Sequence, residues 1–263
     1  MMGPLLGMIV AVAFILLGNV VEGGHIAGLA NLPAAMIVLG GTAGAVLVQY
    51  PMGVVSHGMK IAKKTFGKST VDSAKLIDEI VEYANRARRE GILALEKSAP
   101  SASHPFLAKA LMMAIDGADS ATLRETMEVS MSQAEAHDEE GAKVFEAAGG
   151  YAPTIGIIGA VLGLIHVMSN LSDIAAVGAG IASAFVATVY GVGAANIVCL
   201  PLAGRIKSMV HEETVSKELM LSGVLAIQEG MNPKLVRDRL SGFVHQAHGS
   251  KAGAAGEPAK AEA

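Results

Sequence analysis

The chain of 263 residues has no tryptophan, a single cysteine and only 4% aromatic residues. Cys199 has no second cysteine to pair with, so an intrachain disulfide is excluded, and we interpret it as a small apolar side chain. The net charge is −4, and no stripe of Lys and Arg supplies the electrostatic footprint of a nucleic-acid-binding protein. Disulfide-stabilised scaffolds and nucleic-acid partners are therefore excluded.

Charge is also absent from the interior of four long apolar runs. These are residues 5–21, 34–55, 149–168 and 174–202, and none contains Asp, Glu, Lys or Arg. Each can cover the ~20 helical residues that cross a hydrocarbon core of ~30 Å. None shows the alternation expected of strands in a closed barrel. With 52% hydrophobic and 17% charged residues, the sequence predicts an integral membrane protein with four transmembrane helices rather than a soluble core.

The distribution of Lys and Arg predicts the orientation of these spans. The connections at 22–33 and 169–173 contain neither residue, whereas Lys60, Lys63 and Lys64 follow the second run and Arg205 the fourth. Loops that stay on the cytoplasmic side carry the excess of Lys and Arg. We therefore expect both termini and the long middle segment to lie in the cytoplasm.

The cytoplasmic segments have the apolar periodicity of helices. Within 71–97 the apolar residues recur at steps of three and four, and a third helix, from about 120, is expected to run into the third span because the first proline is Pro153. Asn232 as N-cap and Pro233 at the first helical position predict a short helix at 233–244. The fold class is thus all-α, with four transmembrane helices and long helical extensions into a cytoplasmic domain. The expected organisation is transmembrane helices 1 and 2 at 1–55, a cytoplasmic helical domain at 56–148, transmembrane helices 3 and 4 at 149–202, C-terminal cytoplasmic helices at 203–248 and a disordered tail at 249–263.

Small residues and prolines are frequent in the spans. The spacing of four in Gly40 and Gly44, and again in Gly159 and Gly163, lets helix backbones approach closely in lipid. This packing could lie within one subunit or between copies of the chain, and the sequence leaves both open. Pro153 and Pro201 each remove a backbone hydrogen bond, so each marks either a hinge or a helix boundary.

Ionisable groups that could carry protons through the spans are missing. Proton paths commonly use a membrane carboxylate, and these spans have none, so a second subunit is expected to supply it. Hydroxyl groups such as that of Thr188 are expected in the first place to bond back to carbonyls of their own helix. No phosphate-binding loop, metal-binding His pair or nucleophile elbow is present. We therefore predict no enzyme activity, no cofactor and no metal site.

Four ordered segments of the sequence resemble a known family. They are Glu-Gly-Gly-His at 22–25 with Val-Leu-Gly-Gly-Thr at 38–42, Arg-Arg-Glu-Gly-Ile-Leu-Ala-Leu-Glu at 88–96, Ala-Pro-Thr-Ile-Gly-Ile-Ile-Gly-Ala-Val-Leu-Gly-Leu-Ile at 152–165, and Ala-Thr-Val-Tyr-Gly at 187–191. Together they resemble the MotA-type flagellar stator subunits of the MotA/TolQ/ExbB proton-channel family, over about 1–244.

The resemblance implies an assembly in the bacterial inner membrane. Five copies of the chain are expected to surround two copies of a MotB-like partner, whose transmembrane helix carries the proton-accepting aspartate. Proton flow would turn this homopentamer around the partner. Its cytoplasmic helices would then drag the switch-ring protein of the rotor. Membrane lipid would surround the remaining surface.

The resemblance also assigns roles to individual residues. Arg88 and Glu96 match the two rotor-facing charges, with Arg89 and Glu90 as secondary candidates, and their spacing of eight is expected to place them about two turns apart on one helical face. Pro153 and Pro201 match prolines that couple conformational change to ion passage. Along the proton pathway the expected residues are Thr188, Ala160 and Tyr190.

One departure from the pattern bears on the transported ion. Sodium-driven relatives carry a threonine where this chain has Ala160, so one oxygen ligand for sodium is missing, and we predict proton coupling. The alternative function is an ExbB- or TolQ-like energiser of outer-membrane transport or envelope processes, although those relatives generally have three spans. A self-contained solute transporter would need repeated halves and charged residues at the membrane midplane, which this sequence does not present.

Overall fold

The computed structural model describes residues 3–67, 72–169, 171–172 and 174–253, and at 174–176 and 244–253 it describes the backbone alone. Every described element is a helix, which confirms the all-α class. The chain folds into two compact units, the first made of Met1–Ser69 and His137–Met209 and the second of Thr70–Ala136 and Val210–Ala263. The predicted cytoplasmic segment 56–148 is therefore divided between both units.

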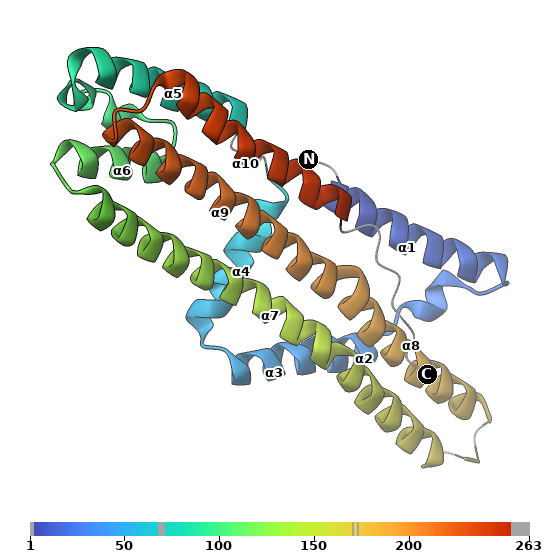
Figure 1. Cartoon of the computed structure of the whole chain (residues 1–263). Helices are drawn as coiled ribbons and strands as arrows, with labels where there is room; N and C mark the ends of the chain where they lie inside the picture. Colours follow the sequence, from blue (N-terminus) through green and yellow to red (C-terminus); the bar gives the residue numbers. More distant parts are fainter. Residues whose placement is uncertain (1–2, 68–71, 170, 173, 254–263) are drawn as a thin grey trace, which may run out of the picture. The chain divides into compact units, whose positions relative to one another are not determined.

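Among the described residues, four helices are long and apolar enough to cross a membrane, as predicted (Figure 1). The first is α1, Gly3–Val21, and the second is Leu32–Gln49. The third lies in α7, Ser120–Met168, and the fourth begins in α8, Ile174–Gly193. The chain is thus a multi-pass membrane protein.

The second span ends earlier than the sequence analysis predicted. It consists of α2 (Leu32–Ala35), a π-helical turn (Met36–Gly40) and α3 (Gly41–Gln49), and a separate helix α4 follows at Met52–Thr65. Tyr50 has an extended backbone, with φ −121° and ψ 138°. Pro51 disfavours a helical conformation in the residue before it, and here one helix ends at Gln49 and another begins at Met52, so the run to residue 55 is not one helix as predicted.

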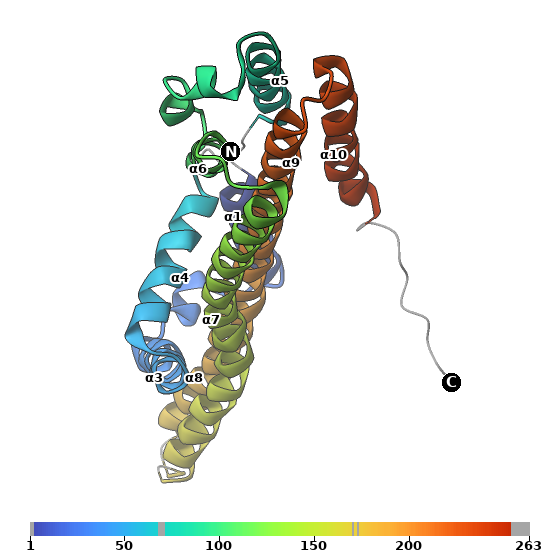
Figure 2. The same ribbon diagram turned by 60° about the vertical axis from the view of Figure 1, so that its left-hand side comes forward.

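The third and fourth spans continue as long helices. α7 is unbroken from Ser120 to Met168 although Pro153 lies inside it, which confirms the predicted continuation. α8 passes through a π-helical turn, Ala194–Cys199, into α9, Leu200–Gln228. The wider turn directly precedes Pro201, whose ring and missing N–H do not fit regular α-helical hydrogen bonding. Within the first unit, both Figures 1 and 2 show α7 and α8 side by side.

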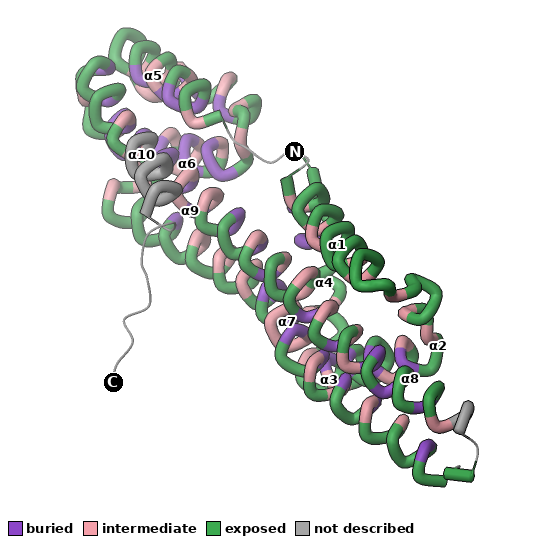
Figure 3. Tube along the Cα trace, turned by 90° about the vertical axis from the view of Figure 1, so that its right-hand side faces the viewer, coloured by how far each residue is buried: buried purple, intermediate pink, exposed green. Residues whose placement is uncertain are grey.

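Helix α1 buries none of its residues within the chain, as Figure 3 shows along its length. Most of its large apolar side chains are exposed, and Phe14 is 69% exposed. An apolar surface of this size is stable in lipid or against another subunit, but not in water. This surface fits the predicted contact with membrane lipid.

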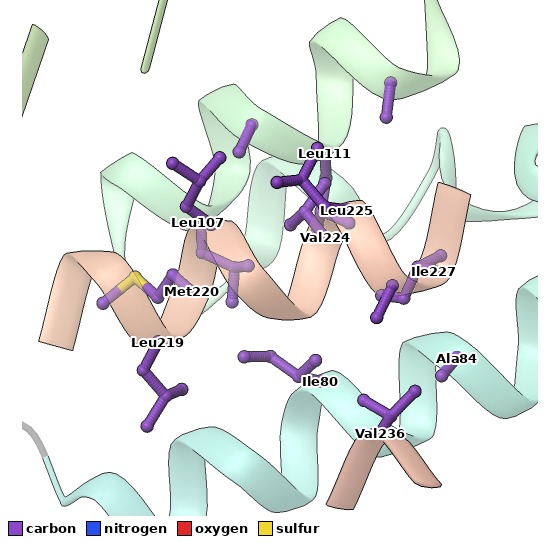
Figure 4. Packing of buried hydrophobic residues seen from close by; sticks show 14 of the residues in the cluster. Ile80, Ala84, Leu107, Leu111, Leu219, Met220, Val224, Leu225, Ile227 and Val236 are labelled. Atoms are coloured by element: carbon purple, nitrogen blue, oxygen red, sulfur yellow. The ribbon is translucent and has the colours of Figure 1, made fainter. Parts of the chain in front are cut away.

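The second unit has its own hydrophobic core (Figure 4). It is built from α5 (Ser73–Glu90), α6 (Pro105–Ile115), α10 (Pro233–Gly253) and the parts of α7 and α9 that belong to this unit. Leu76, Ile77, Ile80 and Ala84 of α5 are buried, so the apolar face predicted from the periodicity is confirmed there. Facing them, and labelled in Figure 4, are residues of the other helices: Leu107, Leu111, Leu219, Met220, Val224, Leu225, Ile227 and Val236.

The helix predicted across 71–97 is interrupted at Gly91. α5 ends at Glu90, and short 3-10 helices follow at Ile92–Leu95 and Ala99–Ser101. Gly91 has φ +86°, a left-handed conformation that glycine adopts without steric cost and that ends an α-helix. Arg88 and Glu96 therefore do not lie on one continuous helical face, and the expected spacing of two turns between them was wrong.

The start of the last helix agrees with the sequence analysis, but its end does not. Asn232 caps α10, because its Oδ1 accepts a hydrogen bond of 3.0 Å from the N–H of Lys234. The helix continues past residue 244 to Gly253, so the first residues of the segment predicted to be disordered from Gly249 are helical. The rest of that segment, 254–263, lies outside the described residues.

Candidate functional site

Helices α7 and α8 pack through small residues in the membrane-spanning part of the first unit. A β-carbon added to Gly156 would lie 2.9 Å from the carbonyl oxygen of Ala187, and one added to Gly191 would lie 2.4 Å from the carbonyl oxygen of Ala152. At Gly159 it would meet Ala187 Cβ at 2.9 Å. These contacts are too close for any larger side chain. For these glycines, packing within one subunit is therefore the correct alternative.

Other glycines of the spans face open space. No atom of the described residues lies within 4 Å of a β-carbon built on Gly40, Gly44 or Gly178. The spacing of four was therefore ambiguous in itself, because Gly159 packs inside the subunit whereas Gly40 and Gly44 present backbone to the outside. This outer surface is available for lipid or for another copy of the chain.

Thr188 and Ala160 lie on the two helices of this tightly packed pair. Thr188 is half-buried, and its hydroxyl donates a long hydrogen bond of 3.5 Å to the carbonyl oxygen of Ala184, one turn earlier. A β-carbon on Gly156 of α7 would lie 3.4 Å from the Cα of Thr188, and Ala160 follows Gly156 by one helical turn. The back-bonding predicted for span hydroxyls is thus present, and its length leaves the Thr188 oxygen weakly engaged.

Tyr190 has a different environment from Thr188. Its hydroxyl donates to the carbonyl oxygen of Leu29 and accepts a hydrogen bond of 3.3 Å from the N–H of Asn31. The side-chain amide of Asn31 also donates to Ser183 Oγ at 2.9 Å. Tyr190 therefore fixes the segment before α2 to helix α8. This tether explains the tyrosine without a role in proton transfer, and such a role stays a prediction.

Each of the two predicted coupling prolines lies within one helical turn of a residue in a contact between α7 and α9. Pro153 cannot donate to the carbonyl of Gly149, the residue one turn before it. A β-carbon on Gly149 would lie 2.6 Å from Leu200 Cδ2, and Leu200 directly precedes Pro201. The weakened turn of α7 thus packs against the weakened turn at the start of α9. This adjacency was not visible in the sequence.

An ion pair joins the same two helices beyond the prolines. Lys207 Nζ lies 2.6 Å from Glu146 Oε1. This hydrogen bond and the charge of Glu146 raise the pKa of Lys207 above its ordinary value, against a smaller opposing effect of desolvation. Glu146 precedes Pro153 in α7 and Lys207 follows Pro201 in α9, so the pair lies outside the segment between the two prolines, which contains Thr188. Bending of either helix at its proline would therefore strain this ion pair.

The predicted rotor-facing residues are all exposed in the second unit. Arg88, Arg89 and Glu90 form the last turn of α5, and Glu96 follows the 3-10 helix Ile92–Leu95. Glu90 lies 3.6 Å from Arg86, whereas the described residues include no ion pair to Arg88 or Arg89. The structure thus presents two uncompensated guanidinium groups at one helix end.

A polar cluster that the sequence analysis missed holds α5 in place. Glu79 accepts hydrogen bonds from Tyr83 Oη at 3.0 Å and from the N–H of Ser103 at 2.9 Å, and the Ser103 hydroxyl donates to its other oxygen. Burial and the hydrogen bond to Glu79 raise the pKa of Tyr83 to about 12. Ser103 is 24 positions from Glu79, so no local pattern could have revealed the cluster.

Comparisons with known proteins agree with the resemblance. The model of the MotA/TolQ/ExbB proton channel family matches residues 98–219, and the model of the N-terminal region of Motility protein A matches 5–91. Chemotaxis protein PomA of Vibrio alginolyticus is 33% identical over 245 residues, 93% of this chain and 96% of that protein. Motility protein A of Bacillus subtilis (strain 168) is 34% identical over 237 residues, 90% of this chain and 88% of that protein. A solved structure, "Structure of C. jejuni MotAB", matches with a TM-score of 0.88 and 32% identity, covering 92% of this chain and 95% of that one.

Proposed function

The chain belongs to the MotA/TolQ/ExbB proton channel family and is a MotA-type subunit of the flagellar stator, and on this premise we propose that five copies of it enclose two copies of a MotB-like partner. Channel subunits of this family are not enzymes, and the family resides in the inner membrane. The solved C. jejuni MotAB assembly supports a partner of this kind. The positions of Lys and Arg support an orientation with both termini in the cytoplasm.

One observation carries the proposal for the proton path. The chain is a proton channel subunit, yet the four apolar runs 5–21, 34–55, 149–168 and 174–202 contain no Asp or Glu. Protons crossing a membrane need a group that binds and releases them, so the carboxylate must come from the partner's helix. Thr188 lies on α8 and Ala160 on α7, the helix pair that would face this carboxylate. Tyr190, also on α8, fixes the segment before α2 to that helix. Pro153 and Pro201 would let these helices bend as the partner's carboxylate changes charge.

We infer the transported ion from the hydroxyl that is missing at Ala160. A sodium ion must exchange its hydration shell for several oxygens, whereas this position offers one hydroxyl and the methyl group of Ala160. At fixed proton-motive force, swimming speed should therefore not change when external sodium is varied. Speed is measured by tracking cells in sodium-free and sodium-rich medium. A speed that rises with sodium would contradict proton coupling.

The rotor contact is tested by reversing one charge. Arg88→Glu should abolish most of the torque, because a like charge facing an acidic partner costs several kcal/mol in an interface. Membrane insertion and ring assembly should stay normal, since the exposed Arg88 has no ion pair among the described residues to lose. Swimming and tethered-cell rotation measure torque, and Lys75→Glu, in the first turn of the same helix, is the control. Loss of the assembled ring in Arg88→Glu would refute the rotor assignment.

The stator is favoured over the ExbB- or TolQ-like energiser by two findings. The N-terminal region matches the Motility protein A model, and the part of the chain that the structure describes holds four candidate spans rather than three. Deleting the gene should leave cells flagellated but paralysed. Outer-membrane uptake in the same strain provides the readout for the alternative.

A further inference from the structure

A cavity of about 340 Å³ opens beside Arg88 in the second unit. Pockets that bind ligands in proteins range from roughly 300 to 1,000 Å³, so this one is large enough for an apolar side chain. Most of the residues that line it are apolar, and three of them are alanines, whereas close to half of its exposed wall is polar. Six of the lining residues are Ala84, Ala87, Arg88, Ile92, Ala114 and Met231.

The cavity is preformed, because the ends of three helices are fixed around it. The N–H of Gly91 bonds to Ala87 at the end of α5, that of Ala118 bonds to Met113 at the end of α6, and that of Met231 bonds to Ala226 at the end of α9, at 2.9, 3.1 and 3.0 Å. These are the backbone bonds that close helix C-termini. A partner would therefore enter an existing cavity and would not have to order one.

The side chain of Gln228 ties two of these helix ends together. Its amide donates to the carbonyl oxygen of Ala118 and its Oε1 accepts a hydrogen bond of 3.1 Å from Ser120 Oγ. Gln228 also lines the cavity. The wall is thus held by a contact between residues 108 positions apart in the sequence.

Positive charge lies at the cavity rather than negative charge. Arg88 is both exposed and part of the lining, and Arg89 follows it without an ion pair among the described residues. Glu229 and Asp116 are exposed near the neighbouring helix ends, but neither lines the cavity. An occupant that complements this surface carries a carboxylate next to an apolar side chain.

We propose that the cavity is a socket for a bulky apolar side chain on an acidic helix of the rotor. The carboxylate of that helix pairs with Arg88, and a leucine, methionine or phenylalanine about one turn away enters the cavity. An exposed ion pair alone adds little affinity and is weakened by salt. An arginine beside a buried apolar anchor is the arrangement typical of strong interface residues. This inference rests on the proposed rotor contact and adds its apolar half.

The test fills the cavity without changing a charge. Ala87→Leu places a side chain into the space, and binding of the full stator complex in nanodiscs to the purified switch-ring protein is measured at low and high salt. Loss of the apolar anchor should weaken binding roughly tenfold or more. This loss should persist at high salt, whereas the weakening by Arg88→Gln should fade. Ala136→Leu adds the same side chain at an exposed position of α7 outside the cavity and should bind normally.

A second variant guards against damage to the fold. Ile92→Ala removes part of the wall without adding bulk, and it should also weaken binding. Each complex is first checked for ring assembly and thermal stability.

Normal binding by both Ala87→Leu and Ile92→Ala together with weak binding by Arg88→Gln would overturn the socket and leave the rotor contact intact. Normal binding by all three would overturn both. Breakdown of the subunit ring in Ala87→Leu would make the cavity an interface between copies and would overturn the socket.

Discussion

A Gly191→Val variant should lose the packed pair of membrane helices, and with it all motility. The valine Cβ would lie 2.4 Å from the carbonyl oxygen of Ala152 and 3.1 Å from the Cα of Gly156. Both atoms belong to the backbone of α7, so no side chain can move aside. Overpacking a core costs typically about 1–3 kcal/mol and more where the backbone must shift. In lipid the close approach of helices is itself the source of stability, so little remains to offset this cost.

The matched control for Gly191→Val lies on the same helix. Gly178 is also in α8, but no described atom lies within 4 Å of its added β-carbon, so Gly178→Val should be inserted and leave α7 and α8 packed. Membrane fractionation with protease sensitivity measures folding, and swim-plate expansion measures function. If Gly191→Val cells swam at normal speed with normal protein levels, the packing of α7 against α8 through small residues would be wrong.

The spans were predictable because the hydrocarbon core imposes a length and an apolar composition that a single sequence displays. Their ends were less predictable, because they depend on local backbone chemistry. Pro51 stops the second span at Gln49, although the apolar run continues to residue 55. Likewise the periodicity of 71–97 continues past Gly91, whose positive φ ends the helix. In both places one residue with special backbone properties overrides the apolar pattern.

The arrangement of the candidate site residues in space could not be predicted from the sequence. Glycine spacing predicts close approach, but it does not say that Gly159 faces Ala187 while Gly44 faces outward. The contact of Gly149 with Leu200 and the hydrogen bond of Ser120 with Gln228 join segments far apart in the chain. Such pairs depend on the packing of whole helices, for which a single sequence carries no signal. The cavity beside Arg88 is also formed by segments far apart in the chain, so the sequence did not reveal it.

The second large effect is expected for Pro153→Leu, which should stop rotation while leaving the subunit in the membrane. Leucine supplies the N–H that Pro153 lacks, so the carbonyl of Gly149 regains its partner and the turn that packs against Leu200 becomes regular. A proline inside a helix costs about 3 kcal/mol, so its removal should shift the balance between bent and straight helix roughly a hundredfold toward straight. A pair of helices that no longer bends at Pro153 cannot follow the partner's change of charge. Membrane fractionation should give normal protein levels, and tethered cells should not rotate.

Pro33→Leu is the control, because a proline in the first turn of α2 withholds no hydrogen bond from its helix and its loss should leave rotation normal. Normal rotation in both Pro153→Leu and Pro201→Leu would exclude bending at the prolines as the coupling step.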